Sequence, residues 1–260
     1  MGIVNVTPDS FSDGGLFADV EAAVAHGLAL FEAGADIVDV GGESTRPGAL
    51  RVEAAEEARR VVPVVEGLRD RGAGPISVDT TKADVARAAL DRGADLVNDV
   101  SGLAFDPAMA PLLAQTEVPA ILMHLRGDFE TIHREPRYGD TIGEVVSELR
   151  QALLRGENAG VKREQLIVDP GIGFSKDPAH SLEVLRRLPE LQALDRPILV
   201  GVSRKSFIGK VLGLPVGDRL MGTAAAVAAS VMAGAHLVRV HDVREMVEVA
   251  RLCDAIRGEA

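Results

Sequence analysis

The strongest constraint on the fold is a regular alternation, along all 260 residues, between short apolar runs and longer segments of helical period. After the first run, for example, apolar residues recur at spacings of three and four between Val20 and Phe31, with Asp19 as the expected N-cap. The runs, with the polar residues that end them, cover 2–5, 36–42, 75–80, 94–102, 118–124, 165–174, 196–206 and 235–242. Eight strand and helix units in series, with strands buried on both faces, predict an α/β fold: a closed parallel (β/α)8 TIM barrel.

Chain length agrees with this fold, since such a barrel typically needs about 250 residues. We therefore expect one domain over residues 1–260. Helices are expected at about 19–35, 51–71, 82–94, 107–115, 141–159 and 243–256. An open doubly wound sheet is the alternative, because eight strands can also lie flat. That fold is expected to carry a Gly-rich phosphate loop after the first strand, and the residues after Asn5 contain none. The GIGF stretch at 171–174 comes after the sixth run and lacks GxGxxG spacing.

Composition narrows the classes of partner. Hydrophobic residues make up 47% of the chain, which is enough for a sizeable core, and the net charge of -11 opposes binding to a nucleic-acid backbone. Cys253 is the single cysteine and is expected to be a packed or partly exposed helix thiol. No apolar stretch reaches the roughly 20 residues that span a bilayer, and the N-terminus lacks a signal-peptide pattern. We expect a cytoplasmic protein without nucleic-acid or membrane partners.

Polar residues stand at the ends of the predicted strands. In a barrel, the carboxyl ends of all strands face one mouth, so residues distant in sequence converge there. The converging residues are Asn5, Glu43, Ser44, Thr45, Arg46, Asp79, Asn98, His124, Asp169, Lys205, Arg239 and His241. Several also have purely structural interpretations: Asp79 as a helix N-cap, Asn98 and Asp169 as turn residues, and His124 as a core histidine. Lys205 is harder to explain in that way, because the chain has five lysines among 28 basic residues.

The strand-end residues separate into two chemical groups. Asp79, Asn98, Asp169 and Lys205 offer carboxylates, an amide and an ammonium, which suit the edge of a flat nitrogen heterocycle. The second group is expected to bind an anion, with Asn5 available to a divalent metal, because it offers hydroxyl, guanidinium and imidazole donors near the strands where barrels often hold phosphate. Its members are Asn5, Thr45, Arg46, Arg239 and His241.

The loop NVTPDSFSDGG, residues 5–15, is unusually rich in polar groups for a connector. It carries the two acids Asp9 and Asp13 and an aromatic residue, Phe11, which is expected to be exposed. A surface Ω-loop with ordinary turns is the alternative interpretation. A functional loop over the barrel mouth accounts better for so many donors and acceptors beside two acids.

The motifs as a set closely resemble the dihydropteroate synthase family, enzymes of folate biosynthesis and a sulfonamide target. The matching pieces are MGIVNVTPDSFSDGG, GGESTRPGA, SVDT, VNDVSG, LMH, VDPGIGF, GVSRKSFIG, GTAAAVAASVMAGA and VRVHDV. The resemblance implies transfer of a dihydropterin-methyl group from its diphosphate to 4-aminobenzoate, giving 7,8-dihydropteroate and diphosphate, with Mg2+ as cofactor.

The resemblance also implies roles for single residues. Asn5 contacts Mg2+. Thr45, Arg46, Arg239 and His241 hold the diphosphate, and Asp79, Asn98, Asp169 and Lys205 hold the pterin. Phe11, Pro47, Ser203 and Ser206 lie near the amine, and Phe174 is a further substrate contact. Two places depart from the family pattern: Leu125–Phe129 follows His124 where the family usually has a Gln-Gly-Thr-Pro-like stretch, and Ser175 replaces a common glycine.

For the mechanism we expect a dissociative, SN1-like substitution without a covalent nucleophile, because the electron-rich ring stabilises positive charge as diphosphate leaves. Asp9, Asp13, Lys205 and Arg239 are the expected catalytic residues. Two rival functions remain open: a pterin-binding methyltransferase, which gives the anion-binding strand ends no purpose, and a catalytically silent homologue, which would be expected to lose loop residues such as Asp13. The apolar helical segments near the C-terminus suggest a homodimer, although core packing explains them equally well.

Overall fold

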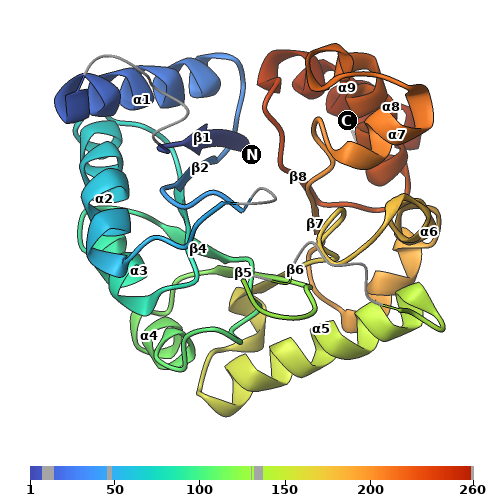
Figure 1. The fold of residues 1–260 in the computed structure, drawn as a ribbon, viewed down its shortest axis with the longest axis horizontal. Helices are drawn as coiled ribbons and strands as arrows, with labels where there is room; N and C mark the ends of the chain where they lie inside the picture. Colours follow the sequence, from blue (N-terminus) through green and yellow to red (C-terminus); the bar gives the residue numbers. More distant parts are fainter. Residues whose placement is uncertain (8–14, 46–48, 130, 132–136, 259–260) are drawn as a thin grey trace.

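The computed structural model describes residues 1–7, 15–45, 49–129, 131 and 137–258, with the backbone alone at 15–18. The described residues form eight parallel strands around a common centre, with helices on the outside (Figure 1). The strands are β1 (Gly2–Asn5), β2 (Val38–Gly41), β3 (Ile76–Asp79), β4 (Leu96–Asp99), β5 (Ala120–Met123), β6 (Leu166–Asp169), β7 (Leu199–Val200) and β8 (Leu237–Val238).

The strands close into a barrel. β1 to β6 form a sheet in chain order, and β7 pairs with β8. Single parallel bridges, Val168 with Ile198 and Gly2 with Val240, join the two sheets at both edges. At the second bridge the Val240 amide donates to the Met1 carbonyl oxygen at 3.0 Å. Because the first and last strands meet, the open-sheet alternative is excluded and the predicted (β/α)8 barrel is confirmed.

The helices differ from the prediction at two points. They are α1 (Gly15–Glu32), α2 (Ala54–Asp70), α3 (Ala83–Leu90), α4 (Met109–Thr116), α5 (Thr141–Asn158), α6 (Pro178–Arg186), α7 (Ser206–Leu212), α8 (Leu220–Met232) and α9 (Val243–Arg257). Asp19 is not an N-cap, because α1 begins at Gly15 and already includes it. Two helices, not one, join β7 to β8, since Gly213 takes a left-handed φ of 70° and Pro215 follows, which ends α7.

The barrel core has two layers with different roles. Outward-facing strand residues such as Val78 pack against the helices, whereas the interior is filled by a separate apolar group. That interior group consists of Met1, Ile37, Leu96, Ile121, Ile167, Leu199 and Leu237. Side chains on a strand alternate in direction, so residues two further along also face inward, at the carboxyl end. This rule brings Asn98, Asp169 and Arg239 into the mouth.

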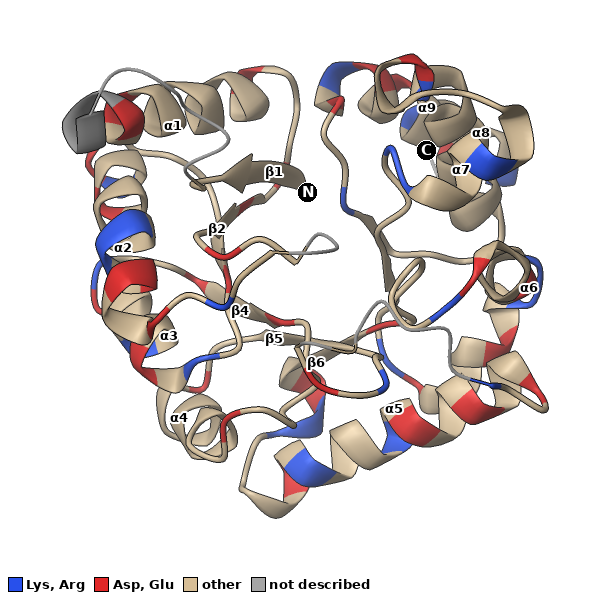
Figure 2. Ribbon diagram, in the orientation of Figure 1, with Lys and Arg blue, Asp and Glu red and all other residues tan. Residues whose placement is uncertain are grey.

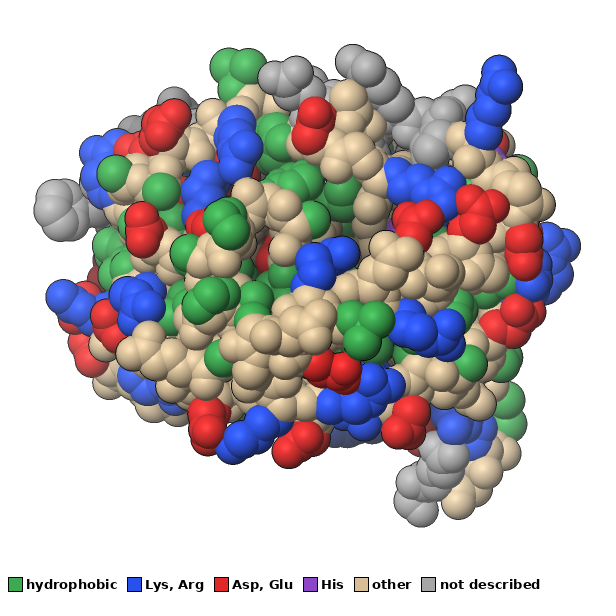
Figure 3. All heavy atoms as spheres, turned by 90° about the horizontal axis from the view of Figure 1, so that it is seen from below, with side chains coloured by type: hydrophobic (Ala, Val, Ile, Leu, Met, Phe, Trp, Pro, Cys, Tyr) green, Lys and Arg blue, Asp and Glu red, His purple; other side chains and the backbone are tan. Residues whose placement is uncertain are grey.

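The outer surface carries intermingled charges. Figure 3 shows acidic and basic side chains interspersed over one face, and Figure 2 shows charged residues near the central strands as well as on the outer helices. On the helical surface, Arg187 pairs with Asp140, Glu183 and Glu190. Cys253 is buried on α9, as predicted for a packed helix thiol. Within the part of the chain that the structure describes, no helix is long and apolar enough to cross a membrane.

Candidate active site

Strand register puts four strand ends at one level of the barrel. Asn5 pairs with Gly41, Gly41 with Asp79, and Asp79 with Asn98, across β1 to β4. Gly41 suits this level because a Cβ there would come within 3.3 Å of the Asp79 Cβ. The absence of a side chain at Gly41 therefore leaves room for the carboxylate of Asp79 at the mouth.

Arg239 reaches from the end of β8 to two carboxylates. Its Nε lies 2.6 Å from Oδ2 of Asp39, and its Nη2 lies 2.8 Å from Oδ2 of Asp79. The Asn98 Nδ2 donates to the same Asp39 oxygen at 3.0 Å. The sequence grouped Arg239 with the anion-binding residues, whereas the structure places its guanidinium against acids that include Asp79, which was predicted to contact the ring. Asp39 was not predicted.

Asp79 and Arg239 differ in how firmly they hold their charge. Burial raises the pKa of Asp79 to about 7, with Asp39 adding to the rise and the Arg239 charge opposing it. Burial works against the charge of Arg239, but Asp39 and Asp79 outweigh it, and the pKa of Arg239 is raised. The guanidinium is therefore a permanent cation, while Asp79 gains or loses its proton near neutral pH.

Asp169 and Lys205 lie on the adjacent part of the same rim. The Gly171 amide donates to Oδ1 of Asp169 at 2.7 Å, and the Lys205 Nζ donates to the Ile172 carbonyl oxygen. Lys205 also lies 4.5 Å from the centroid of the Phe174 ring, within cation–π range. Burial lowers the pKa of Lys205 to about 8, although the Asp169 charge opposes that shift.

Lys205 and Arg239 share one opening. A Cβ built on Gly201 would lie 3.9 Å from the Lys205 Nζ and 4.0 Å from the Arg239 Cβ. Burial raises the pKa of the Asp169 carboxyl, and the charges of Lys205 and Arg239 are among the effects that oppose this rise. The ring-binding residues therefore do not face a different rim from the residues at the end of β8.

Other predicted contacts that the structure describes lie at or after the ends of β1, β2, β7 and β8. His241 Nδ1 lies 3.0 Å from Oγ of buried Ser203, and Ser206 is exposed at the start of α7. Asn5 and Thr45 are half-buried at and beyond the ends of β1 and β2. The predicted residues Asp9, Phe11, Asp13, Arg46 and Pro47 lie outside the described residues.

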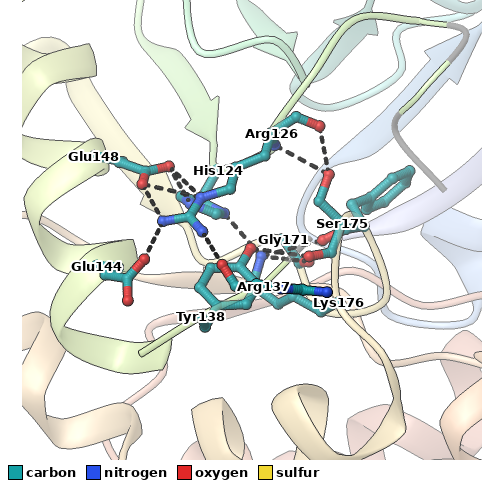
Figure 4. Close-up of polar contacts among 10 residues, drawn as sticks. His124, Arg126, Arg137, Tyr138, Glu144, Glu148, Gly171, Ser175 and Lys176 are labelled. Carbon is teal, nitrogen blue, oxygen red and sulfur yellow. Dashed lines mark hydrogen bonds and ion pairs between the residues drawn. The ribbon is translucent and has the colours of Figure 1, made fainter. Parts of the chain in front are cut away.

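Beside the mouth, a buried cluster joins the ends of β5 and β6 (Figure 4). The Lys176 Nζ lies 2.8 Å from His124 Nδ1, and His124 Nε2 lies 3.0 Å from Glu148 on α5. Lys176 donates further to the carbonyl oxygens of Gly171 and Phe174, each at 3.2 Å. Burial lowers the pKa of His124 to about 4, so its ring is neutral. Since the Glu148 carboxylate only accepts, the Nε2–H of His124 donates to it and Nδ1 accepts from Lys176.

The two sequence departures in this region contact each other. The Arg126 amide donates to Oγ of Ser175 at 3.0 Å, and the Ser175 hydroxyl donates to the Arg126 carbonyl oxygen at 2.7 Å. Tyr138 donates to the Ser175 carbonyl oxygen at 2.9 Å, and the Arg126 guanidinium lies 4.0 Å above the Tyr138 ring (Figure 4). Ser175 holds a left-handed φ of 47°, which glycine adopts more readily, and these hydrogen bonds offset that cost.

A second buried cluster supports the segment after β2. Lys82 donates to Oε1 of Glu43 at 2.9 Å and also to Oε2 of Glu57. The same Glu43 oxygen accepts from the Val52 amide at 2.6 Å. Glu43 thereby joins the two ends of the segment that carries Thr45, and Lys82 holds the Glu43 carboxylate in place. Burial raises the pKa of Glu57 even though the hydrogen bond from Lys82 lowers it.

The donor chemistry fits a magnesium ion bound mainly by substrate. Mg2+ takes oxygen ligands and usually keeps several waters beside one or two protein groups and substrate phosphates. The Asn5 amide oxygen at the mouth is a suitable protein ligand. No group of three or more His, Cys, Asp or Glu residues able to hold a metal occurs among the described residues, so a fully protein-built cage is not found there.

Sequence comparison defines the class of protein that this barrel represents. Residues 1–241 match the family of pterin binding enzymes, so the chain belongs to the pterin-binding barrel enzymes. The chain is 47% identical to dihydropteroate synthase from Synechocystis over 257 residues, which cover 98% of this chain and 89% of that protein. It belongs to the dihydropteroate synthase family, as its motifs indicated.

Solved structures agree with this assignment. Xanthomonas albilineans dihydropteroate synthase with 4-aminobenzoic acid superposes with a TM-score of 0.93 at 46% identity, covering 99% of this chain and 92% of that one. The same enzyme in complex with 7,8-dihydropteroate gives a TM-score of 0.89 at 43% identity, again with 99% and 92% coverage.

Three residues next to the mouth that carry strong contacts were not predicted from the sequence: Asp39, Lys82 and Lys176. Signals for each were present. Asp39 stands two residues before Gly41 and so shares its inward direction. The scarcity of lysine, which singled out Lys205, applies equally to Lys82 and Lys176, and both are buried.

Proposed function

We propose that this chain joins the methylene carbon of (7,8-dihydropterin-6-yl)methyl diphosphate to the amine of 4-aminobenzoate, releasing diphosphate, in tetrahydrofolate biosynthesis. The observation that carries this proposal is the convergence of Asp79, Asn98, Asp169, Lys205 and Arg239 on one barrel mouth, in a member of the dihydropteroate synthase family.

The ring-binding part of the proposal follows from donor and acceptor counts. A carboxylate accepts two parallel hydrogen bonds from adjacent N–H groups of an aminopyrimidinone, a role that suits the buried Asp169. Lys205 donates to a ring carbonyl or nitrogen, and the Phe174 ring beside it offers an apolar contact face. Asp79 and Asn98 complete the set at the same level of the barrel.

In the proposed mechanism the bond between the methylene carbon and the diphosphate oxygen breaks before the new bond forms. Arg239 and His241, with Thr45 and Arg46, hold the departing diphosphate, and the dihydropterin ring delocalises the positive charge. Asn5 would hold Mg2+, which when bound would supply charge neutralisation at the leaving oxygens. Asp9 and Asp13 of the first loop shield the cation from water. The amine nitrogen then forms the C–N bond and releases one proton to solvent.

The test separates bond breaking from bond making. We expect diphosphate release to require Mg2+, and product to form only when 4-aminobenzoate is added. Asp13→Asn is expected to slow release of diphosphate, product formation or both, because its carboxylate is assigned to the cationic stage. Unchanged rates for both steps would contradict that role, and absence of turnover by the wild-type chain would contradict the function itself.

We propose that this chain forms a homodimer through α7, α8 and α9, which lie together in Figure 1. Large apolar side chains are exposed on this part of the surface, and a two-fold contact between copies would cover them. They are Val211, Leu212, Val216, Leu220, Met221, Met232, Leu252 and Ile256.

The dimer proposal is tested by the molar mass in solution. Met221→Glu with Leu252→Glu places two charges in the exposed apolar surface and is expected to give monomers in sedimentation experiments. Leu154→Glu on α5, a leucine 47% exposed outside this surface, is the matched control and is expected to leave the dimer intact. A monomeric wild-type chain would overturn the proposal.

Two broader assignments belong to the same proposal. Residues 1–260 are taken as a single pterin-binding domain, because the barrel needs its first and last strands to close. The cytoplasm is taken as its location, since the single cysteine is compatible with a reducing compartment.

A further inference from the structure

Asp39 is a fully buried carboxylate in the middle of β2. It pairs in register with Ile3 and Ser77 and stands two residues before Gly41, so it faces the barrel interior one layer below Asp79. A buried carboxylate is unfavourable unless charged or polar partners compensate for its lost hydration. Any role of Asp39 therefore depends on the side chains that it contacts.

Both partners of Asp39 are residues assigned to substrate. A single oxygen, Oδ2, accepts from Nε of Arg239 at 2.6 Å and from Nδ2 of Asn98 at 3.0 Å. Arg239 follows β8 and Asn98 belongs to β4, so this oxygen connects two strands that are not neighbours in the barrel. Among the described residues, Asp39 is the carboxylate that contacts both of these side chains, whereas Asp79 contacts Arg239 alone.

The contact fixes the direction of the Asn98 amide. An amide has a donor end and an acceptor end, and a carboxylate accepts only. Because Nδ2 donates to Asp39, Oδ1 of Asn98 is the end left to accept from a bound molecule. Without the carboxylate, the amide has less reason to keep this orientation.

The same contact also limits how the Arg239 guanidinium turns. Nε is held by Asp39 in the interior, and Nη2 by Asp79, whose side chain is 20% exposed at the mouth. These contacts leave Nη1 as the nitrogen that neither carboxylate engages. Asp39 is thus the inner, water-excluded anchor, and Asp79 is the outer one.

We propose that Asp39 is a positioning residue, an inference that rests on the proposed function. Its Oδ2 sets the amide direction of Asn98 and the orientation of the Arg239 guanidinium before substrate binds. A purely structural ion pair would make a different prediction, since its loss lowers stability without a selective effect on the pterin substrate.

The test replaces Asp39 by Asn, which keeps its shape, removes its charge and introduces an N–H donor facing the donors of Asn98 and Arg239. Ser77→Ala, in register with Asp39 and equally buried, is the matched control. We expect Asp39→Asn to lower kcat on the order of 100-fold, as misplaced binding groups do. The dissociation constant of the pterin diphosphate, measured by calorimetry, is expected to rise about tenfold or more, the loss typical of a broken charge-assisted contact.

The second substrate shows whether the effect of Asp39→Asn is selective. The KM for 4-aminobenzoate is expected to stay within about threefold, as for a contact confined to the other substrate. Asp39→Asn with kcat and pterin affinity close to those of wild type, or losses equal to those of Ser77→Ala, would overturn the proposal. Wild-type turnover is measured first, so that a failure of the proposed function is seen separately, and pterin binding tests Asp39 without turnover.

If Asp39→Asn alone does not fold, a double variant is compared with Arg239→Gln. The double variant Asp39→Asn with Arg239→Gln removes both charges of the buried pair, which is tolerated better than leaving one unpaired. An Asp39 that acts through Arg239 predicts non-additive losses, with the double variant retaining a kcat within about tenfold of Arg239→Gln. A further loss as large as that expected in the wild-type background would contradict the proposal.

Discussion

The Lys176 Nζ lies 2.8 Å from Nδ1 of His124, and this contact ties the loop after β6 to the end of β5. Lys176 also donates to the carbonyl oxygens of Gly171 and Phe174, so its Nζ lies within hydrogen-bond distance of three acceptors. Gly171 allows the close approach of the two loops, because a Cβ there would lie 2.0 Å from the His124 carbonyl oxygen and its φ is 66°. This cluster therefore stabilises the turn that follows Asp169.

The first prediction concerns stability. Lys176→Met removes the nitrogen that three buried acceptors share, and we expect the free energy of unfolding to fall by about 3 kcal/mol at pH 7. Urea unfolding followed by circular dichroism measures the change. Lys162→Met, whose ammonium pairs with Glu117 on the surface, is the control and should change stability by less than about 0.5 kcal/mol. Equal effects of the two variants would show that the buried cluster adds nothing.

The second prediction is the pH dependence of that loss. Burial lowers the pKa of Lys176 from 10.5 to about 7, against the raising effect of Asp169. Between these values the unfolded chain binds a proton that the folded chain does not, so the stability contributed by this group rises with pH. We therefore expect Lys176→Met to be more destabilising, relative to wild type, at pH 9 than at pH 7. A difference that shrinks over this range would contradict the neutral, buried amine.

The third prediction is a bell-shaped pH profile of kcat/KM for the pterin substrate. Asp79 must be ionised to accept ring N–H groups, and its pKa of about 7 produces the acidic limb. Lys205 must be protonated to donate, and its pKa of about 8 produces the alkaline limb. Activity is thus expected to fall below pH 7 and above pH 8.

Variants assign the two limbs. Asp79→Asn should remove the acidic limb, and Lys205→Arg should move the alkaline limb well above pH 10, because a guanidinium keeps its proton. Ionisation of the diphosphate itself remains in every variant and serves as the internal reference. Limbs that stay in place in both variants would show that other groups control the profile.

The sequence predicted the barrel well because short apolar runs that end in polar residues alternate with longer segments, several of them of clear helical period, along the whole chain. The run around Val38–Gly41 shows the limit of this reasoning. Its apolar residues identified a strand, but Arg239, a partner of Asp39, lies 200 residues away just after β8, and no local pattern encodes a contact of that range. The pairing of Arg126 with Ser175 is similar: both departures were visible, but their contact depends on how β5 and β6 sit side by side.

For the candidate site, the sequence predicted the direction of strand-end residues but not the contacts of a long side chain. Period-two alternation gives the direction of Asp79, Asn98 and Asp169. It does not give the path of a long side chain, so Arg239 was grouped by its position in sequence with His241, although its guanidinium turns toward Asp39 and Asp79.

The last prediction concerns the buried Lys82 beneath the segment after β2. Lys82→Met removes the only cation that the structure describes against the fully buried Glu57 carboxylate, leaving that acid unpaired. We expect the free energy of unfolding to fall by about 3–5 kcal/mol, the usual cost of breaking one side of a buried pair.

Adding Glu57→Gln should restore much of the lost stability, because the uncompensated charge is then gone, whereas the surface variant Lys210→Met should have little effect. The double variant still lacks the ammonium that holds Glu43, so the segment carrying Thr45 loses one anchor. Its KM for the pterin diphosphate is therefore expected to rise although stability has recovered. Recovery of both stability and KM would mean that Lys82 serves only to neutralise Glu57, and unrecovered stability would mean that the unpaired carboxylate is not the cause of the loss.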